Sequence, residues 1–210
     1  ADFIIVDPDR VEVTNLNRLV GAGPADVGKF KCDVAAKMVS RINPDARVVA
    51  VKGDIVDADV ADQLRAVDFI FICTDSHASR AVIGQLAYQF LIPAIDMGVS
   101  ITMGSAGASH ITGRVQMLSP GLPCLLCSNA LDSEQVRREL MTPEQRAADP
   151  YVVGHHEPQP AVISLNSTVA SLATTMFLGA VTPIPATARL QIYNGVRGTV
   201  REMQVGIVEN

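Results

Sequence analysis

Short apolar runs alternate with longer amphipathic stretches through the first half of the chain. We predict strands at four of these runs, residues 3–6, 47–51, 68–75 and 92–97, and expect the first and third to be buried. The first, Phe3 to Val6, is too short and too rich in β-branched residues for a helix, as is typical of buried parallel strands. The intervening segments predict helices over residues 28–42, 57–66 and 76–90. Val34, Met38 and Ile42 give the first helix an apolar stripe at four-residue spacing.

This alternation predicts an α/β fold, a doubly wound, Rossmann-like and mostly parallel sheet, because the connections are long enough for right-handed crossovers. After Gly98 the pattern changes. Gly-rich segments at residues 104–108 and 113–118 indicate short antiparallel strands that extend the sheet. A closing hairpin is expected from residues 190–193, a turn at Asn194-Gly195, and residues 198–205.

Two further segments complete a single domain over residues 1–210. Residues 128–160 are the least apolar part and predict a charged surface helix and a loop, an insertion that crosses over the ligand crevice. Residues 161–181 carry no charge and are nearly long enough to span a bilayer. Because this stretch contains seven serine, threonine and asparagine residues, we interpret it as a buried helix and expect no membrane partner.

Composition narrows the class of protein. The chain has 210 residues, 48% of them hydrophobic, which is enough for one substantial core. A formal net charge of −5 argues against a nucleic-acid surface. The N-terminus is not signal-like, and four cysteines suit a reducing cytoplasm better than a disulfide framework.

Two acidic residues follow predicted strands. Asp7 comes directly after residues 3–6, and Asp75 ends the run at residues 68–75. Ligands of open parallel sheets bind beyond the carboxyl ends of the strands. We therefore expect Asp7 and Asp75 to face one crevice, where Asp7 can accept hydrogen bonds from ribose hydroxyls. Asp75 can hold Mg²⁺ between itself and phosphates, or Asp75 or Ser76 can cap the following helix.

Polar residues after Asp7 can bind phosphate. Arg18 supplies a planar positive fork, and Asn15 and Asn17 can add hydrogen bonds. The alternative is a solvated loop. Lys31 lies in the first turn of a predicted helix, where a cation is usually disfavoured, so it is either a solvated lysine or placed for an anion. Residues 23–29 fit the start of a P-loop, but Phe30 replaces the required Ser or Thr, and we interpret the segment as a loop.

Cys124 and Cys127 have the spacing of half a tetrahedral Zn²⁺ site. Of the other possible ligands, Cys32 and Cys73 are expected in the core, and adjacent His155 and His156 rarely both reach one metal. A redox pair and two unlinked surface thiols are the alternatives.

The chain resembles the E1-like family of ubiquitin-activating enzymes, of the ThiF, MoeB and HesA type. The resemblance covers nearly the whole chain and rests on five motifs in order: residues 7–18 (DPDRVEVTNLNR), 27–31 (VGKFK), 41–44 (RINP), 73–75 (CTD) and 123–127 (PCLLC). It departs from the family in two places. No thioester-forming cysteine follows Cys127, and residues 160–166 replace the usual Gly- and Gln-containing helix start.

The resemblance implies ATP-dependent adenylation of the C-terminal carboxylate of a ubiquitin-like or sulfur-carrier protein with a Gly-Gly tail, releasing pyrophosphate. It implies catalytic roles for Arg18, Lys31 and Asp75, and contacts to ATP and Mg²⁺ from Asp7, Thr14, Asn15, Asn17, Arg18, Lys31, Asp75 and Ser76. It further implies a structural Zn²⁺ that Cys124 and Cys127 bind in part, and a homodimer. The family's Gly-rich strand-turn-helix is expected before residue 1, and its partner-subunit arginine is also outside this chain, so activity of the isolated chain is not implied.

Two other classes of function fit the residues. Asp7 suits the ribose of NAD as well as that of ATP, which would make the protein a dinucleotide-dependent oxidoreductase. A non-catalytic E1-like scaffold that binds a ubiquitin-like partner is the second. Within the family, the activated group could also belong to a peptide or a tRNA base.

Overall fold

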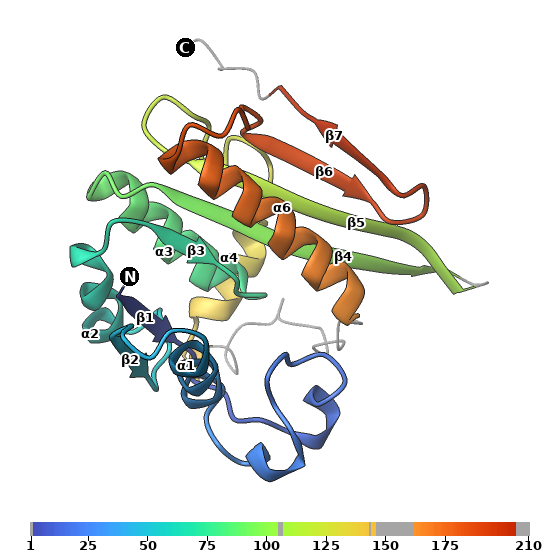
Figure 1. Cartoon of the computed structure of the whole chain (residues 1–210). Helices are drawn as coiled ribbons and strands as arrows, with labels where there is room; N and C mark the ends of the chain where they lie inside the picture. Colours follow the sequence, from blue (N-terminus) through green and yellow to red (C-terminus); the bar gives the residue numbers. More distant parts are fainter. Residues whose placement is uncertain (1, 105–106, 143, 146–161, 205–210) are drawn as a thin grey trace. The chain divides into compact units, whose positions relative to one another are not determined.

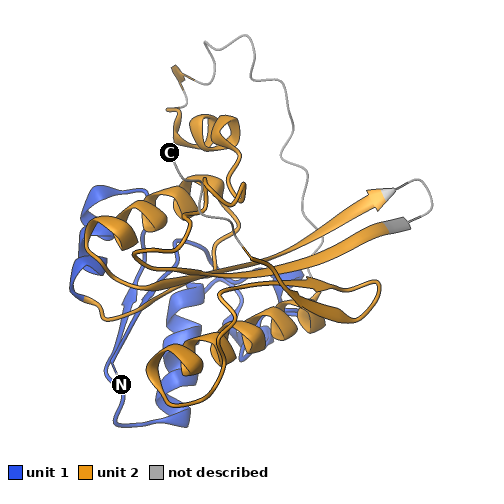
Figure 2. Ribbon diagram, turned by 90° about the horizontal axis from the view of Figure 1, so that it is seen from above, with its two compact units in different colours: residues 1–66 blue, residues 67–210 orange. Residues whose placement is uncertain are grey.

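The computed structural model describes residues 2–104, 107–142, 144–145 and 162–204, and Figure 1 labels its helices and strands. The chain forms two compact units, residues 1–66 and residues 67–210, coloured separately in Figure 2. Among the described residues, the first unit has a two-stranded sheet and the second a five-stranded sheet. His155, His156 and most of the predicted insertion lie outside the described residues.

The first unit is built on two parallel strands. Strand β1 (Phe3–Val6) pairs with β2 (Val48–Val51), with Phe3 opposite Val48. The unit also contains helices α1 (Lys31–Ile42) and α2 (Ala58–Ala61) and the 3-10 helices η1 (Val13–Asn15), η2 (Pro24–Asp26) and η3 (Asp62–Ala66). Both predicted strands and the predicted crossover helix are confirmed, but α1 begins at Lys31, three residues later than expected.

The expectation that the first strand is fully buried was wrong. Phe3 is 41% exposed and Ile4 is 37% exposed. In the described sheet β1 has β2 as its one hydrogen-bonded neighbour, so it is an edge strand and not the central strand of a wide buried sheet. Cys32, in contrast, is completely buried in α1, as expected.

The second unit begins with a parallel pair and continues antiparallel. Strand β3 (Ile70–Ile72) is joined to β4 (Ala94–Gly104) by helix α3 (His77–Gln89), and the two strands are parallel. Strands β5 (Gly107–Leu118), β6 (Leu190–Asn194) and β7 (Thr199–Glu202) then add in antiparallel order. Helices α4 (Ser133–Leu140) and α6 (Ile163–Val181) complete the unit. The α/β prediction with an antiparallel extension is confirmed, and the extension is larger than expected.

Two details of the extension differ from the prediction. Residues 104–108 are not a separate short strand, because β4 and β5 form one long hairpin paired from Ala94–Leu118 to Gly104–Gly107. In the last hairpin Asn194 pairs with Thr199, so the turn has four residues, 195–198, and not two. The Asn194 Oδ1 accepts the N–H groups of Val196 and Arg197, and Gly198 adopts φ +64°.

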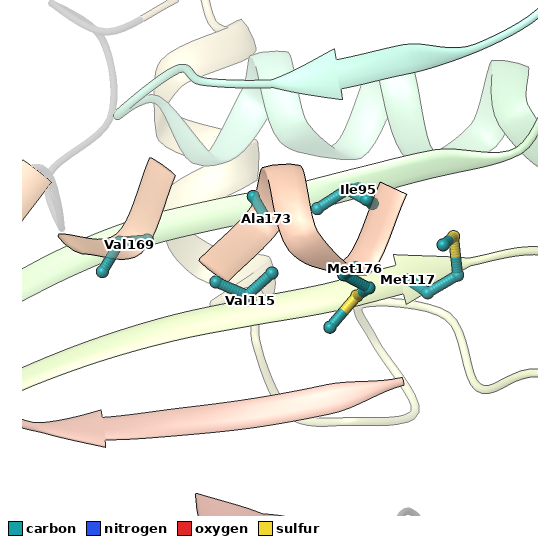
Figure 3. Packing of buried hydrophobic residues seen from close by; sticks show 6 residues of the cluster. All are labelled: Ile95, Val115, Met117, Val169, Ala173 and Met176. Carbon is teal, nitrogen blue, oxygen red and sulfur yellow. The ribbon is translucent and has the colours of Figure 1, made fainter. Parts of the chain in front are cut away.

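Successive residues of β4 and β5 point to opposite faces of the sheet, and each face is covered by a different helix. Ile95, Val115 and Met117 pack against the α6 residues Val169, Ala173 and Met176, as Figure 3 shows. Asp96, between Ile95 and Met97, contacts Arg80 of α3. One face is therefore apolar, and the other buries charge.

Helix α6 is buried on one side only, which corrects the prediction of a buried helix. Within the described part of the chain it is the one helix long and apolar enough to span a membrane by length and composition, and 17% of that stretch is buried. Its exposed hydroxyl groups donate to carbonyls one turn earlier in the same helix; these are Thr168, Ser171, Thr174 and Thr175.

Candidate functional site

The end of β1 carries Asp7. Its Oδ1 accepts the backbone N–H of Asp9 at 2.8 Å, and its own N–H donates to the carbonyl of Val51 in β2. The turn after β1 therefore follows from the Asp-Pro-Asp sequence: an Asx turn holds the chain where β1 ends. Asp7 is half-buried at this position.

A long loop returns to this point and brings Lys31 with it. Val11 donates to the carbonyl of Lys29 and Lys31 donates to that of Asp9, both at 2.8–2.9 Å. The Arg10 guanidinium lies 3.9 Å from the centre of the Phe30 ring and donates to Gly28. As a result the Lys31 Nζ is 2.6 Å from the Asp9 Oδ2. Lys31 is thus an ion-paired residue at the strand end and not a solvated lysine.

The predicted phosphate-binding residues form one tight turn. Arg18 donates through Nη1 to the carbonyl of Thr14 at 2.7 Å and to Asn17 Oδ1 at 3.4 Å. Asn15 is 9% exposed, and its Oδ1 accepts the N–H of Glu12, so its side chain stabilises η1. The Thr14 hydroxyl donates to Glu12. These contacts fix the turn, and the predicted binding of ATP by its side chains stays a prediction.

The end of β3 carries Asp75, and its carboxylate is exposed. Ser76, not Asp75, caps α3: the Ser76 Oγ accepts the N–H of Ser79 at 3.1 Å. Among the described residues, no hydrogen bond or ion pair engages the Asp75 side chain. The two roles that the sequence left open for this position are therefore divided between neighbours. Serine takes the cap and leaves both Asp75 oxygens available to a metal ion.

Helix α4 holds the first turn of α3. The Glu139 Oε2 accepts from the Ser76 hydroxyl and from the N–H of Ala78, both at 2.7 Å. At the other end of α4, the N–H of Asp132 donates to His77 Nδ1 at 3.1 Å. Partial burial raises the pKa of Glu139, but the hydrogen bonds from Ala78 and Ser76 outweigh it, so its pKa lies below the ordinary value.

The two cysteines of the Cys-x-x-Cys sequence share one turn. Their sulfur atoms are 3.3 Å apart, and the N–H of Cys127 points to the Cys124 sulfur. Burial raises the pKa of Cys124, yet the hydrogen bonds from Cys127 bring it below the ordinary value. In the described part of the chain no third His, Cys, Asp or Glu joins them in a metal-binding group. A zinc site at Cys124 and Cys127 therefore stays a prediction. Cys73, expected in the core, is an exposed residue, and its thiol contacts Met97.

The predicted residues fall into two groups. Asp7, Arg18 and Lys31 belong to the first unit, whereas Asp75 and Ser76 belong to the second. That they line one crevice stays a prediction. Sequence reasoning missed the partners of these residues, Asp9 and Glu139. The two-residue spacing of Asp7 and Asp9 was a signal for the first, whereas no local signal marks a contact between Glu139 and Ser76, which are 63 residues apart.

Comparison with known proteins places this geometry in a family. The model of the ThiF family matches residues 1–208. The chain belongs to the ThiF family. Two solved structures agree with it in fold. E. coli MccB, in a crystal structure with AMPCPP and MccA, superposes with a TM-score of 0.70 at 16% identity, over 98% of this chain and 56% of MccB. PaaA gives a TM-score of 0.67 at 19% identity, over 97% of this chain and 56% of PaaA. The predicted Rossmann-like fold is confirmed.

Two curated relatives show how this ThiF-family chain compares in sequence. It is 33% identical over 91 residues to the adenylyltransferase and sulfurtransferase UBA4 of Meyerozyma guilliermondii, which covers 43% of this chain and 22% of that protein. It is 25% identical over 156 residues to ubiquitin-like modifier-activating enzyme 5 of Culex quinquefasciatus, which covers 65% of this chain and 37% of that protein. The chain therefore matches less than half the length of either relative.

Proposed function

We infer that this ThiF-family protein uses ATP to adenylate the C-terminal carboxylate of a ubiquitin-like or sulfur-carrier protein. The observation that carries this proposal is the family match over residues 1–208. The names of two relatives, an adenylyltransferase and an activating enzyme of a ubiquitin-like modifier, support the reaction class. The proposal includes a homodimer and a zinc site to which Cys124 and Cys127 contribute.

In the proposed reaction a carboxylate oxygen of the carrier attacks the α-phosphorus of ATP. A bond forms between this oxygen and phosphorus, the bond from phosphorus to the bridging oxygen breaks, and pyrophosphate leaves. Such a transfer needs positioned charge more than covalent help from the protein. Asp7 would accept hydrogen bonds from the ribose, and Asn15, Asn17, Arg18 and Lys31 would bind phosphate oxygens.

Asp75 would hold Mg²⁺, for which its exposed and unengaged carboxylate is suited. A bound Mg²⁺ would neutralise charge that develops on the phosphates. Before any ligand binds, Lys31 is paired with Asp9. A triphosphate would therefore compete with the Asp9 carboxylate for the Lys31 ammonium group.

The test is ATP–pyrophosphate exchange by the full-length protein against a panel of carriers that end in Gly-Gly. Asp75→Ala should abolish exchange, because it removes the metal ligand. Asp68→Ala is the matched control: Asp68 is an exposed aspartate before β3, whereas Asp75 follows this strand, and its loss should leave exchange unchanged. Wild-type exchange by Asp75→Ala would remove Asp75 from the mechanism. Carrier binding without exchange would favour the scaffold, and binding of NAD(H) in place of ATP would favour an oxidoreductase.

A further inference from the structure

The face of the second sheet that α3 covers contains a buried charge cluster that the proposed reaction does not use. Asp96 of β4 is 0% exposed, and its Oδ2 lies 3.5 Å from Arg80 Nη1 and 3.1 Å from Arg114 Nη1. The two arginine side chains are themselves 16% and 19% exposed. Burying three charged groups costs free energy of desolvation, so such a cluster calls for an explanation in terms of the geometry that it fixes.

Arg80 links three parts of the unit with one side chain. Its Nε donates to the carbonyl of Thr74 at 3.0 Å, its Nη2 donates to the carbonyl of Met97 at 3.2 Å, and its Nη1 faces Asp96. The guanidinium therefore connects the loop after β3 to the first half of β4. A planar fork with five donors can make these contacts together, and a lysine ammonium cannot.

The contact to Thr74 acts directly on Asp75. The Thr74 carbonyl belongs to the planar peptide unit that joins Thr74 to Asp75, so a hydrogen bond to this oxygen fixes the plane from which the Asp75 side chain starts. On the other side of Asp75, the N–H of Ser76 donates to the Thr74 hydroxyl at 3.2 Å, and the Ser76 hydroxyl donates to Glu139. The backbone is held on both sides of Asp75, while its carboxylate is left unengaged among the described residues.

The β4 backbone leaves space for this arrangement at Gly98. A Cβ atom at Gly98 would lie 2.4 Å from Arg80 Nη2, much closer than two such atoms can approach. A side chain at this position would push the guanidinium out of the place that it occupies against the strand. The missing side chain of Gly98, and not an unusual backbone conformation, therefore makes room for Arg80.

We propose that Arg80, held by Asp96 in the space left by Gly98, is a positioning residue that orients Asp75 for Mg²⁺. The proposal rests on the adenylation function for the role of Asp75. Arg80 acts through the Thr74 carbonyl and touches neither the metal ion nor the nucleotide. Groups that support a metal ligand typically change metal affinity by 10–100-fold when they are lost.

Three variants of the full-length protein test the proposal. Arg80→Lys keeps the charge and removes the fork. Gly98→Ala leaves Arg80, Asp96 and Asp75 unchanged and displaces the guanidinium. Gly84→Ala is the matched control, because a Cβ at this helix glycine meets Leu125 at 3.7 Å, an ordinary contact. Each variant is first shown to be folded by its circular dichroism and unfolding midpoint.

The first measurement is the Mg²⁺ concentration that gives half-maximal ATP–pyrophosphate exchange. Arg80→Lys and Gly98→Ala should raise it about tenfold, and saturating Mg²⁺ should restore most of the rate. Gly84→Ala should not change it. A folded Arg80→Lys or Gly98→Ala protein with wild-type Mg²⁺ dependence overturns the proposal, as does an equal shift in Gly84→Ala, because the effect would then be general.

The second measurement does not depend on activity. Amide hydrogen exchange at residues 73–76 should be faster in Arg80→Lys and Gly98→Ala than in the wild type or Gly84→Ala, because the loop has lost its anchor. Unchanged exchange there overturns the proposal. If the wild type neither exchanges pyrophosphate nor binds Mg²⁺–ATP, the adenylation function fails, and this measurement still decides whether Arg80 fixes the loop.

Discussion

The ends of β1 and β3 each present an acidic residue, but the two ends are organised in opposite ways. At the end of β1 the charges are partly exposed and already paired: Asp9, with a side chain 63% exposed, lies 2.6 Å from Lys31, whose side chain is 25% exposed. At the end of β3 the acid is exposed and unengaged among the described residues, and the charges around its backbone are paired in the interior, where Asp96 is 0% exposed.

This difference shows two ways of preparing charge for a ligand. Surface ion pairs contribute little to stability, so Lys31 can exchange Asp9 for a phosphate at small cost. A buried ion pair breaks only at high cost, so Arg80 and Asp96 keep one geometry whether or not a ligand is bound. The first arrangement suits residues that change partners, and the second suits residues that must not move.

The largest effect is expected when an aspartate of each ion-paired group is replaced by asparagine. Asp96→Asn should lower the free energy of unfolding of the second unit by about 3 kcal/mol or more, because two buried guanidinium groups lose their counterion. Asp9→Asn should cost at most about 1 kcal/mol, since the Asp9 side chain is 63% exposed and water screens its charge. Urea unfolding followed by circular dichroism measures both. Equal and small losses would show that the buried cluster contributes no more than a surface pair.

A smaller effect is expected for Arg18 in the first unit. Arg18→Ala should lower the rate of ATP–pyrophosphate exchange about tenfold, or about 1.4 kcal/mol of transition-state stabilisation, because the α-phosphorus loses a positive neighbour. Arg41→Ala, at the exposed last turn of α1, is the control and should exchange normally. Unchanged kinetics in Arg18→Ala would leave the turn at residues 13–18 with a structural role only.

The smallest effect is the pH dependence of the contact between α4 and α3. Glu139→Gln should destabilise the second unit by about 1 kcal/mol at neutral pH, as expected for loss of a capping carboxylate. Folding lowers the pKa of Glu139. Its contribution to stability is therefore fully present above the ordinary pKa that it has in the unfolded chain, and it is lost as the pH falls through the lower pKa of the folded state.

The difference in unfolding free energy between the wild type and Glu139→Gln, measured from pH 7 to pH 3, should therefore shrink toward acid. Glu202→Gln, on the exposed strand β7, is the control and should change stability little. A difference that does not vary with pH would mean that the Glu139 amide replacement acts through packing and not through charge.

Patterns local in sequence predicted the elements and the residues at the strand ends well. The apolar runs located β1 to β4, and the resemblance to E1-like proteins led to the ThiF family, which the comparison confirmed. Ser76 and Asp75 were correctly placed at the start of α3, but a cap and a metal ligand require the same oxygens, so sequence alone could not divide the roles.

What sequence could not supply was long-range pairing. Asp96 is a polar residue among apolar neighbours in β4, and its two arginine partners lie 16 and 18 residues away on different elements. The sequence between residues 98 and 113 contains several glycines, so it did not show at which of them the chain reverses, and the register of the β4–β5 hairpin depends on that position. Cys73 was expected in the core because it follows the apolar residues of β3. The strand ends at Ile72, one residue earlier, and Cys73 is exposed.

Four hydroxyl groups of helix α6 use their hydrogens for bonds to the backbone of the same helix. Thr168, Ser171, Thr174 and Thr175 each donate to their own backbone, so their oxygens remain outside as acceptors while their donors are already satisfied. A count of serine and threonine therefore overstates how strongly this helix demands water. At these four positions a neighbour with few polar groups could lie against the helix without leaving a hydroxyl donor unsatisfied.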